Sequence, residues 1–185
     1  RRQIFAGAQG WDIDAVLSTC RRAMAADRTY QAPYNRAYGI YMKLRNYRQA
    51  GDVLAEYLRA DPGAIHFRLA LGELYLKNIN DLDRAEKEFT AVLEMADRIG
   101  ADDYYRHQAC ADLGYVWYRR NDVDKSIDWF EKANVYGEGD ETVIFMLCHL
   151  HMVRYHIQDA ERYGLQYDRM VPGNDSIASV MGRIR

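Results

Sequence analysis

The sequence predicts an all-α fold in which pairs of antiparallel helices stack into a solenoid. Three observations lead to this prediction. Only three prolines interrupt the 185 residues, and few stretches alternate apolar and polar residues as strands do. A motif of small and large apolar residues recurs along the chain. The fifteen tyrosines are far more than usual, and many of them fall within or beside this motif.

The two clearest copies of the motif are RLALGELYLKNINDLDRAEKEF (residues 68–89) and CADLGYVWYRRNDVDKSIDWF (residues 110–130). Each contains Leu-Gly, an aromatic residue three positions after the glycine, a polar turn, a small residue and a later Phe. Residues 35–54 and 144–164 are weaker copies, with Gly39 and Cys148 at the glycine place. The small residues of successive copies are 35, 41 and 34 positions apart, which indicates a period close to 34 with one insertion. These residues are Ala50, Ala85, Ser126 and Ala160.

This pattern resembles the tetratricopeptide repeat (TPR), whose signature combines Leu-Gly, Tyr, Ala, Phe and Pro at these offsets. The resemblance runs from about residue 4 to residue 174. It implies a right-handed superhelix of helix pairs, with the first helix of each pair lining the concave face. We therefore expect a single TPR-like domain over residues 1–185. Its expected parts are a half repeat (1–27), repeats at about 31–64, 65–100, 104–140 and 141–174, and a capping helix (175–185).

Stacking of such pairs also follows from physical chemistry, because one helix pair cannot bury its apolar stripe alone. The glycine places, including Gly39 and Cys148, are expected where two helices approach closely. The register of the first repeat stays open by one residue, because Gly39 lies 11 residues before Ala50 and the other spacings are 12 or 13. Phe89, Phe130 and Trp117 are expected to fill the remaining space. In the half repeat, a first helix ends near residue 9 and a second runs from 12 to about 26. Asp122 is the expected N-cap of the helix that follows it, and the insertion within residues 94–105 should lengthen a helix and its loop.

Charge and composition exclude several classes of function. The formal net charge is −2, which argues against a nucleic-acid partner. No apolar run approaches the ~20 residues of a membrane-spanning helix, so we expect no direct membrane insertion. The scattered cysteines, three in all, favour a reducing compartment such as the cytoplasm, and the periplasm stays open if an export signal was removed. Because the chain begins with Arg1, we expect it to be a piece of a longer protein.

Motifs that carry chemistry are few. No phosphate-binding loop, HExxH, GxSxG or paired-carboxylate signature occurs, so the sequence predicts no enzymatic activity and no cofactor. Cys148, His149, His151 and the nearby His156 are residue types that bind zinc. We interpret them as structural, because Cys148 occupies the small packing place and His149 points along another helix face. No metal site is therefore predicted.

The TPR resemblance implies which side chains face the concave groove. In the first two repeats they are Arg36, Ile40, Lys43, His66, Leu69, Glu73, Leu76 and Lys77. In the last two they are Gln108, Ala111, Tyr115, Tyr118, Arg119, Thr142, Phe145, His149, Met152 and Val153. Tyrosines give large contact area at low entropic cost, so Tyr115 and Tyr118 are the favoured ligand contacts. The basic side chains among these residues either contact a ligand or only keep the surface hydrated.

The leading hypothesis is a non-catalytic scaffold whose concave groove binds a peptide or helix of another protein. Two alternatives stay open. The chain ends can stack head to tail into a homo-oligomer through their apolar edges, or the chain is a regulatory or targeting segment of a larger enzyme or of a secretion or assembly machine. The carboxylate clamp of chaperone-binding TPR proteins is excluded, because Ile40 and Glu73 stand where its asparagines would be.

Overall fold

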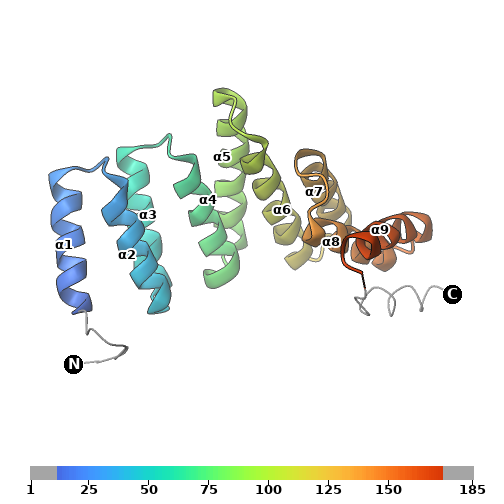
Figure 1. The fold of residues 1–185 in the computed structure, drawn as a ribbon, viewed down its shortest axis with the longest axis horizontal. Coiled ribbons are helices and arrows are strands. Elements are labelled where there is room, and N and C mark those ends of the chain that lie inside the picture. Colours follow the sequence, from blue (N-terminus) through green and yellow to red (C-terminus); the bar gives the residue numbers. More distant parts are fainter. Residues whose placement is uncertain (1–11, 173–185) are drawn as a thin grey trace.

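A computed structural model describes residues 12–172, and this part of the chain is helical with no strand (Figure 1). The helices are α1 (Ile13–Ala26), α2 (Gln31–Lys43), α3 (Tyr47–Ala60), α4 (Ile65–Leu74), α5 (Leu82–Ile99), α6 (Asp103–Arg119), α7 (Val123–Tyr136), α8 (Glu141–Val153) and α9 (Ile157–Met170). A short π-helix, η1 (Tyr75–Ile79), continues α4. The all-α prediction is confirmed.

The helices stand side by side in one row that runs from α1 to α9 (Figure 1). Neighbours in the chain pack against each other along the whole row, as expected of a solenoid. The helices α4 and α6, which open successive pairs, also touch each other. The surface shared by the opening helices α2, α4, α6 and α8 is called the inner face below. No helix within residues 12–172 is long and apolar enough to cross a membrane.

Close contacts between small and large residues hold the central pairs together, as predicted. A Cβ atom added to Gly72 would lie 2.6 Å from the Phe89 ring, and one added to Gly114 would lie 2.8 Å from Phe130. Both phenylalanines are completely buried. Ser126 sits at the small place of the third pair and donates a 2.8 Å hydrogen bond from Oγ to the Gly114 carbonyl oxygen. Glycine at these places therefore makes room for a ring from the partner helix.

The expectation that Gly39 also marks a close approach is wrong. A Cβ atom built on Gly39 would meet no heavy atom within 4 Å. The first repeat instead carries a larger residue, Tyr38, at the equivalent place, as the hydrogen bonds of its turn show.

In the first turn, the Asn46 N–H donates to the Tyr41 carbonyl oxygen at 2.9 Å. The corresponding bond of the third pair runs from the Asp122 N–H to the Trp117 carbonyl oxygen at 3.0 Å. Tyr41 therefore aligns with Trp117, which follows its glycine by three residues. Counting back three residues from Tyr41 places Tyr38 at the glycine place, so the first repeat is shifted by one position from the predicted register.

The second pair accommodates one extra residue between its glycine and its small residue, and η1 is where this residue fits. The backbone N–H of Asp81 reaches back to the Tyr75 carbonyl oxygen at 2.9 Å, across a turn that is one residue longer than in the other pairs. Asn80 closes the turn in the left-handed region, with φ of 61°. A π-turn of this kind is the usual way for a helix to absorb a single inserted residue.

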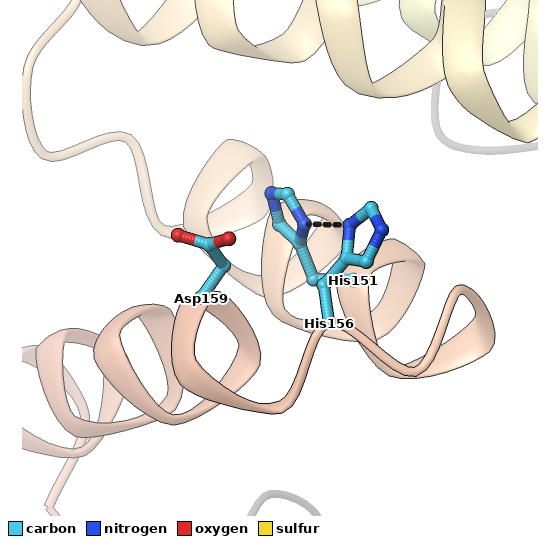
Figure 2. Close-up of side chains that lie close together, drawn as sticks. All are labelled: His151, His156 and Asp159. Carbon is cyan, nitrogen blue, oxygen red and sulfur yellow. Dashed lines mark hydrogen bonds between the residues drawn. The ribbon is translucent and has the colours of Figure 1, made fainter.

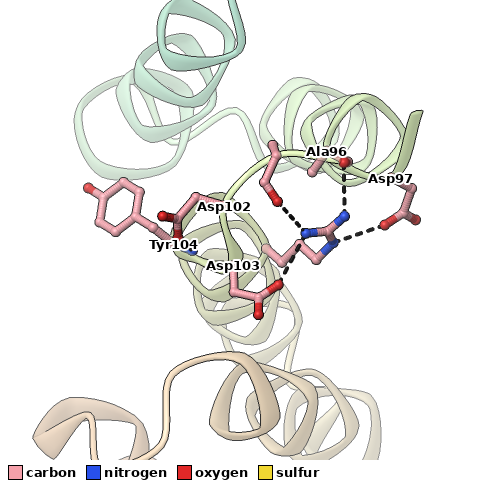
Figure 3. Close-up of polar contacts among 7 residues, drawn as sticks. Ala96, Asp97, Asp102, Asp103 and Tyr104 are labelled. Carbon is pink, nitrogen blue, oxygen red and sulfur yellow. Dashed lines mark hydrogen bonds and ion pairs between the residues drawn. The ribbon is translucent and has the colours of Figure 1, made fainter. Parts of the chain in front are cut away.

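The larger insertion lengthens α5 to 18 residues, and Gly100 ends the helix with φ of 61°. Arg106 of α6 then fixes the loop to both helices (Figure 3). Its guanidinium donates to the carbonyl oxygens of Ala96 (2.8 Å) and Ala101 (2.6 Å), and to the carboxylates of Asp97 (3.0 Å) and Asp103 (3.1 Å). The expected longer helix is confirmed. The loop is not longer: residues 100–102 connect α5 to α6, and the rest of the insertion extends α6, which has 17 residues against 13 in α2 and α8.

Aspartates cap the starts of helices such as α1 and α7, and the cap predicted at Asp122 is confirmed. Asp12 accepts hydrogen bonds from the first turn of α1, and Asp122 accepts one of 3.1 Å from the Lys125 N–H. Trp117 differs from its prediction, because its ring is only partly buried and lies under the cations of Arg120 (4.6 Å) and Lys125 (4.0 Å). The helices expected before residue 10 and over 175–185 lie outside the described residues.

Candidate partner-binding face

A small group of polar side chains lies on the inner face where α4 and η1 meet α6. Lys77 Nζ is 2.7 Å from Glu73 Oε1 and 3.5 Å from Asp112 Oδ1, so it links the second pair to the third. Tyr38 and Tyr115 lie close enough to feel these charges. We call these five residues the inner-face polar cluster. Sequence analysis placed Glu73, Lys77 and Tyr115 in the groove, and the structure brings these three together.

Asp112 is the most unusual member, since its residue is only 4% exposed. Its Oδ2 atom has no hydrogen-bond partner among residues 12–172. Burial raises the pKa of the Asp112 carboxyl to about 6, the Lys77 ammonium partly opposes this, and the Glu73 charge adds to it. The Lys77 ion pair therefore compensates only part of the cost of burying this charge.

The other titratable members respond to the same surroundings. Partial burial alone would lower the pKa of Lys77, but the charges of Asp112 and Glu73 outweigh it and raise the pKa above its ordinary value. Burial raises the pKa of the Tyr38 and Tyr115 hydroxyls. Lys77 thus stays charged and half exposed, and two of the three donors of its ammonium face carboxylates. Within the part of the chain that the structure describes, its third donor is left for solvent or a ligand.

A second, aromatic part of the inner face joins α6 to α8. The Tyr118 ring meets the His149 ring edge to face, with centroids 6.3 Å apart. Tyr118 is 42% exposed and His149 is partly exposed, so both rings are accessible. Met152 of α8 is also partly exposed. Phe145, in contrast, packs against Tyr167 of α9 at 5.7 Å and belongs largely to the hydrophobic core.

Tyr115 is less accessible than Tyr118, because it packs against the core as Phe145 does. Its ring packs edge to face on Phe130 at 5.1 Å, and it is partly buried between two sections of the core. Only one member of the predicted tyrosine pair is therefore freely exposed. Leu69 and Leu76, also expected in the groove, are buried in the core.

Arg119, predicted as a groove cation, is engaged within the protein. Its Nη1 donates to the Leu76 carbonyl oxygen at 2.6 Å and to Asn80 Oδ1 at 3.0 Å. Both acceptors belong to the π-helical turn or its end. The guanidinium therefore ties α6 to the inserted turn of the second pair.

The remaining predicted cations and His66 lie on the helices α2 and α4. Arg36, Lys43 and His66 are exposed. The one-residue shift of the first repeat moves the groove places matched to Arg36 and Ile40 onto Asn35 and Gly39. Lys43 keeps a groove place in the corrected register.

Asp112 and Tyr38 are the two members of the inner-face polar cluster that were not predicted as site residues, and Asp112 is the more informative of them. Its signal was an acid between Ala111 and Leu113, two positions before a packing glycine, in a helix with few other charges. Only the neighbouring repeat supplies Lys77, and that neighbour is 35 positions away in the sequence.

The cysteine and histidine motif of the fourth repeat is not gathered into one site. Cys148 is buried and its thiol points to the Ala160 carbonyl oxygen at 3.3 Å, whereas His149 lies on the inner face. Burial raises the pKa of the Cys110 and Cys148 thiols to about 11. Neither thiol is therefore an activated nucleophile.

Two surface pockets lie away from the inner face. One of about 220 Å³ is bordered by Arg28, Tyr34 and Glu56, and one of about 470 Å³ lies along α5 between Asp83 and Glu94. Neither is lined by a member of the inner-face polar cluster. The inner face is better suited to an extended ligand than to an enclosed small molecule.

Comparison with solved structures identifies the class of fold. YrrB, a TPR protein with an unusual peptide-binding site, superposes with a TM-score of 0.71 at 14% identity, over 90% of this chain and 82% of its own. MamA gives 0.70 at 16% identity (91% and 92%), and PilF of Pseudomonas aeruginosa gives 0.67 at 17% (90% and 72%). The chain thus has the fold of a TPR-like solenoid, as its repeats predicted. No protein-family model and no curated protein matches the sequence.

Proposed function

We propose that the protein is a non-catalytic scaffold that binds a peptide or helix of another protein along its inner face. The observation that carries this proposal is the accessible Tyr118–His149 ring pair of α6 and α8, on the same inner face as the half-exposed Lys77 ammonium. Within residues 12–172 this ammonium pairs with two carboxylates, which leaves one of its donors for a ligand. Rings that stand out from two neighbouring helices offer an apolar contact with little loss of side-chain entropy. The lysine adds a polar anchor for a backbone carbonyl or a carboxylate of the ligand.

Two further observations support the proposal. The thiols of Cys110 and Cys148 are held neutral by burial, which supports a role other than nucleophilic catalysis for these two cysteines. The fold is also shared with YrrB, a TPR protein with a peptide-binding site. An extended ligand lying across successive opening helices would contact Lys77, Tyr118 and His149 in turn.

The test compares three forms of the chain as bait in affinity capture from the native cell. The double variant Tyr118→Ala/His149→Ala removes the exposed rings, and Tyr155→Ala is the matched control, because Tyr155 is an 85% exposed tyrosine on the α8–α9 turn. We expect proteins that are retained by the wild type and the control but lost by the double variant, with mass spectrometry as the readout. Circular dichroism checks that all three forms are folded.

Equal retention of every captured protein by the double variant would contradict an inner-face site. Light scattering over a concentration series tests the alternative that the occupant is a second copy of the chain. In that case the mass would rise with concentration for the wild type and not for the double variant. The sequence of the complete gene tests whether the scaffold belongs to a larger enzyme.

A further inference from the structure

Two histidines and an aspartate meet at the turn between α8 and α9, on side chains that the proposed scaffold function does not use. His151 lies in the last turn of α8, His156 immediately precedes α9, and Asp159 lies in its first turn. One potential ligand atom from each residue lies within 4.8 Å of the others. Figure 2 shows the two imidazole rings facing each other, with the Asp159 carboxylate on the same side of the turn.

The separation of the two imidazoles fits a shared metal ion. Their Nδ1 atoms are 3.3 Å apart. Zinc binds imidazole nitrogen at 2.0–2.1 Å in tetrahedral geometry, which sets two such nitrogens about 3.3 Å apart. Without a metal, the same distance requires one Nδ1 to carry a proton and donate it to the other. Metal binding and a direct hydrogen bond are therefore distinct and separable explanations.

His156 departs from what the other repeats place at this position. The equivalent residues Asn46, Asp81 and Asp122 each accept a hydrogen bond from a backbone N–H of the following helix. His156 makes no side-chain capping bond to α9. Its ring is turned toward His151 instead, so the helix gives up an ordinary cap at this one turn.

The surroundings of His151 supply the outer contacts typical of a metal ligand. The residue is only 6% exposed, and its Nε2 has no hydrogen-bond partner within residues 12–172. Glu131 Oε1 lies 3.6 Å from Nε2, an ion-pair distance that is too long for a hydrogen bond. Coordination through Nδ1 would fix the proton on Nε2, facing this carboxylate. Glu131 is itself held by a 2.7 Å hydrogen bond from the Tyr163 hydroxyl, and the Tyr163 ring stacks on His151 at 5.6 Å.

Asp159 completes the set as the oxygen ligand. Its Oδ1 is paired with Arg162 Nη2 at 3.2 Å, but both side chains are largely exposed, with 45% and 61% of their surface accessible. Such a surface ion pair contributes little free energy and yields readily to a metal ion. Two neutral imidazoles and one carboxylate favour zinc or a similar transition-metal ion over magnesium, which prefers oxygen ligands.

We infer that the α8–α9 turn binds one divalent transition-metal ion, for which Zn²⁺ is the best match, through His151, His156 and Asp159. Three protein ligands leave a fourth coordination position for water or for a group of a bound partner. Since the ligands come from both helices of the last described pair, the ion would fasten the end of α8 to the start of α9.

The test uses the full chain without a histidine tag, freed of metal with a chelator. Zinc chloride is titrated by calorimetry, and thermal unfolding is recorded with and without one equivalent of zinc. We expect saturable binding of one ion and a higher Tm with zinc, and no comparable response to magnesium. Absence of one-equivalent zinc binding, or an equal response to magnesium, would overturn the inference.

Matched variants locate the site. His156→Asn restores the cap found at Asn46 and should abolish zinc binding while the metal-free Tm stays the same or rises. His149→Asn changes another histidine of α8 and should bind zinc as the wild type does. Glu131→Gln removes an outer contact and should weaken binding about 10–100-fold. Asp159→Asn removes a ligand and should weaken binding further. Binding by His156→Asn within threefold of the wild type would show that the ion lies elsewhere and would overturn the assignment.

Discussion

Lys77 Nζ lies 3.5 Å from Asp112 Oδ1, so a half-exposed ammonium of one repeat covers a carboxylate that is buried in the next. The pair spans the boundary between η1 and α6 on the inner face. Because the compensation is incomplete, the ionised carboxyl costs free energy in the folded protein. Lys77 therefore affects both the stability of the fold, through Asp112, and the chemistry of the proposed binding face.

The cost of ionising Asp112 makes stability dependent on pH. Its pKa is about 6 in the folded protein against an ordinary value of 3.8, so the folded state holds the proton more tightly. The stabilising contribution is complete below pH 3.8 and is lost as pH rises through about 6. We expect Asp112→Asn to stabilise the protein relative to wild type at pH 7 by up to about 3 kcal/mol.

The measurement is urea unfolding of both forms between pH 4 and pH 8. The advantage of Asp112→Asn should be small near pH 4, grow up to about pH 6 and then stay level. The variant Lys77→Met is the complement, because it removes the compensating charge and should lower stability mainly above pH 6. An advantage of Asp112→Asn that is constant over the whole range would contradict a raised pKa of Asp112.

Two glycines in equivalent-looking motifs should respond oppositely to alanine. A Cβ at Gly114 would press into the Phe130 ring at 2.8 Å, so Gly114→Ala should destabilise the protein by roughly 1–3 kcal/mol. Gly39 lies within α2 and faces open space, so Gly39→Ala should stabilise by up to about 1 kcal/mol through helix propensity. Chemical unfolding monitored by circular dichroism gives both values.

A loss of stability in Gly39→Ala equal to that in Gly114→Ala would restore the uncorrected register of the first repeat. Adding Phe130→Leu to Gly114→Ala in a double variant should recover part of the lost stability, since the smaller side chain leaves room for the methyl group.

A variant of Arg119 distinguishes a structural role of this side chain from a role in ligand binding. Because its guanidinium donates to the Leu76 carbonyl oxygen and to Asn80, Arg119→Ala should destabilise η1 and cost about 1 kcal/mol of stability. Hydrogen exchange of the amides in residues 77–81 should become faster in the variant. Weakened partner binding together with unchanged exchange would instead assign Arg119 to the ligand.

The buried thiols should react only when the protein opens. With a pKa of about 11, Cys110 and Cys148 hold roughly a thousandth of their thiol as thiolate at pH 8. We expect slow modification by a thiol reagent in native buffer and complete modification in denaturant, followed by absorbance. Fast reaction of the native protein at either cysteine would contradict the packing of these side chains. The single variants Cys110→Ala and Cys148→Ala assign the two rates.

The periodic part of the structure was predictable because small and large side chains recur at nearly the same spacing in successive repeats. The pairs Gly72–Phe89 and Gly114–Phe130 each indicate two closely packed helices, and their repetition strengthens this prediction. The prediction for Gly39 was wrong because this glycine is adjacent to Tyr38, the residue at the equivalent position, and matches the motif in sequence alone. The hydrogen bonds of the turn, which identify Tyr38, are a three-dimensional property.

The site was predictable only in outline for the same reason. The faces of the helices follow from helical spacing, which is why Lys77 of η1, Tyr118 of α6 and His149 of α8 could be proposed as residues of one face. Which of them are accessible depends on contacts between repeats that are not encoded in local spacing. Arg119 is occupied by a carbonyl of the preceding pair, and Asp112 is significant only because Lys77 lies above it.

The wide turn at Tyr75–Ile79 has a consequence for how such an array changes its length. The extra residue widens one turn of the helix, and the helix pairs on either side of it still pack against each other. The protein can therefore accept one extra residue at the end of this helix while the later repeats keep the same side chains on the inner face.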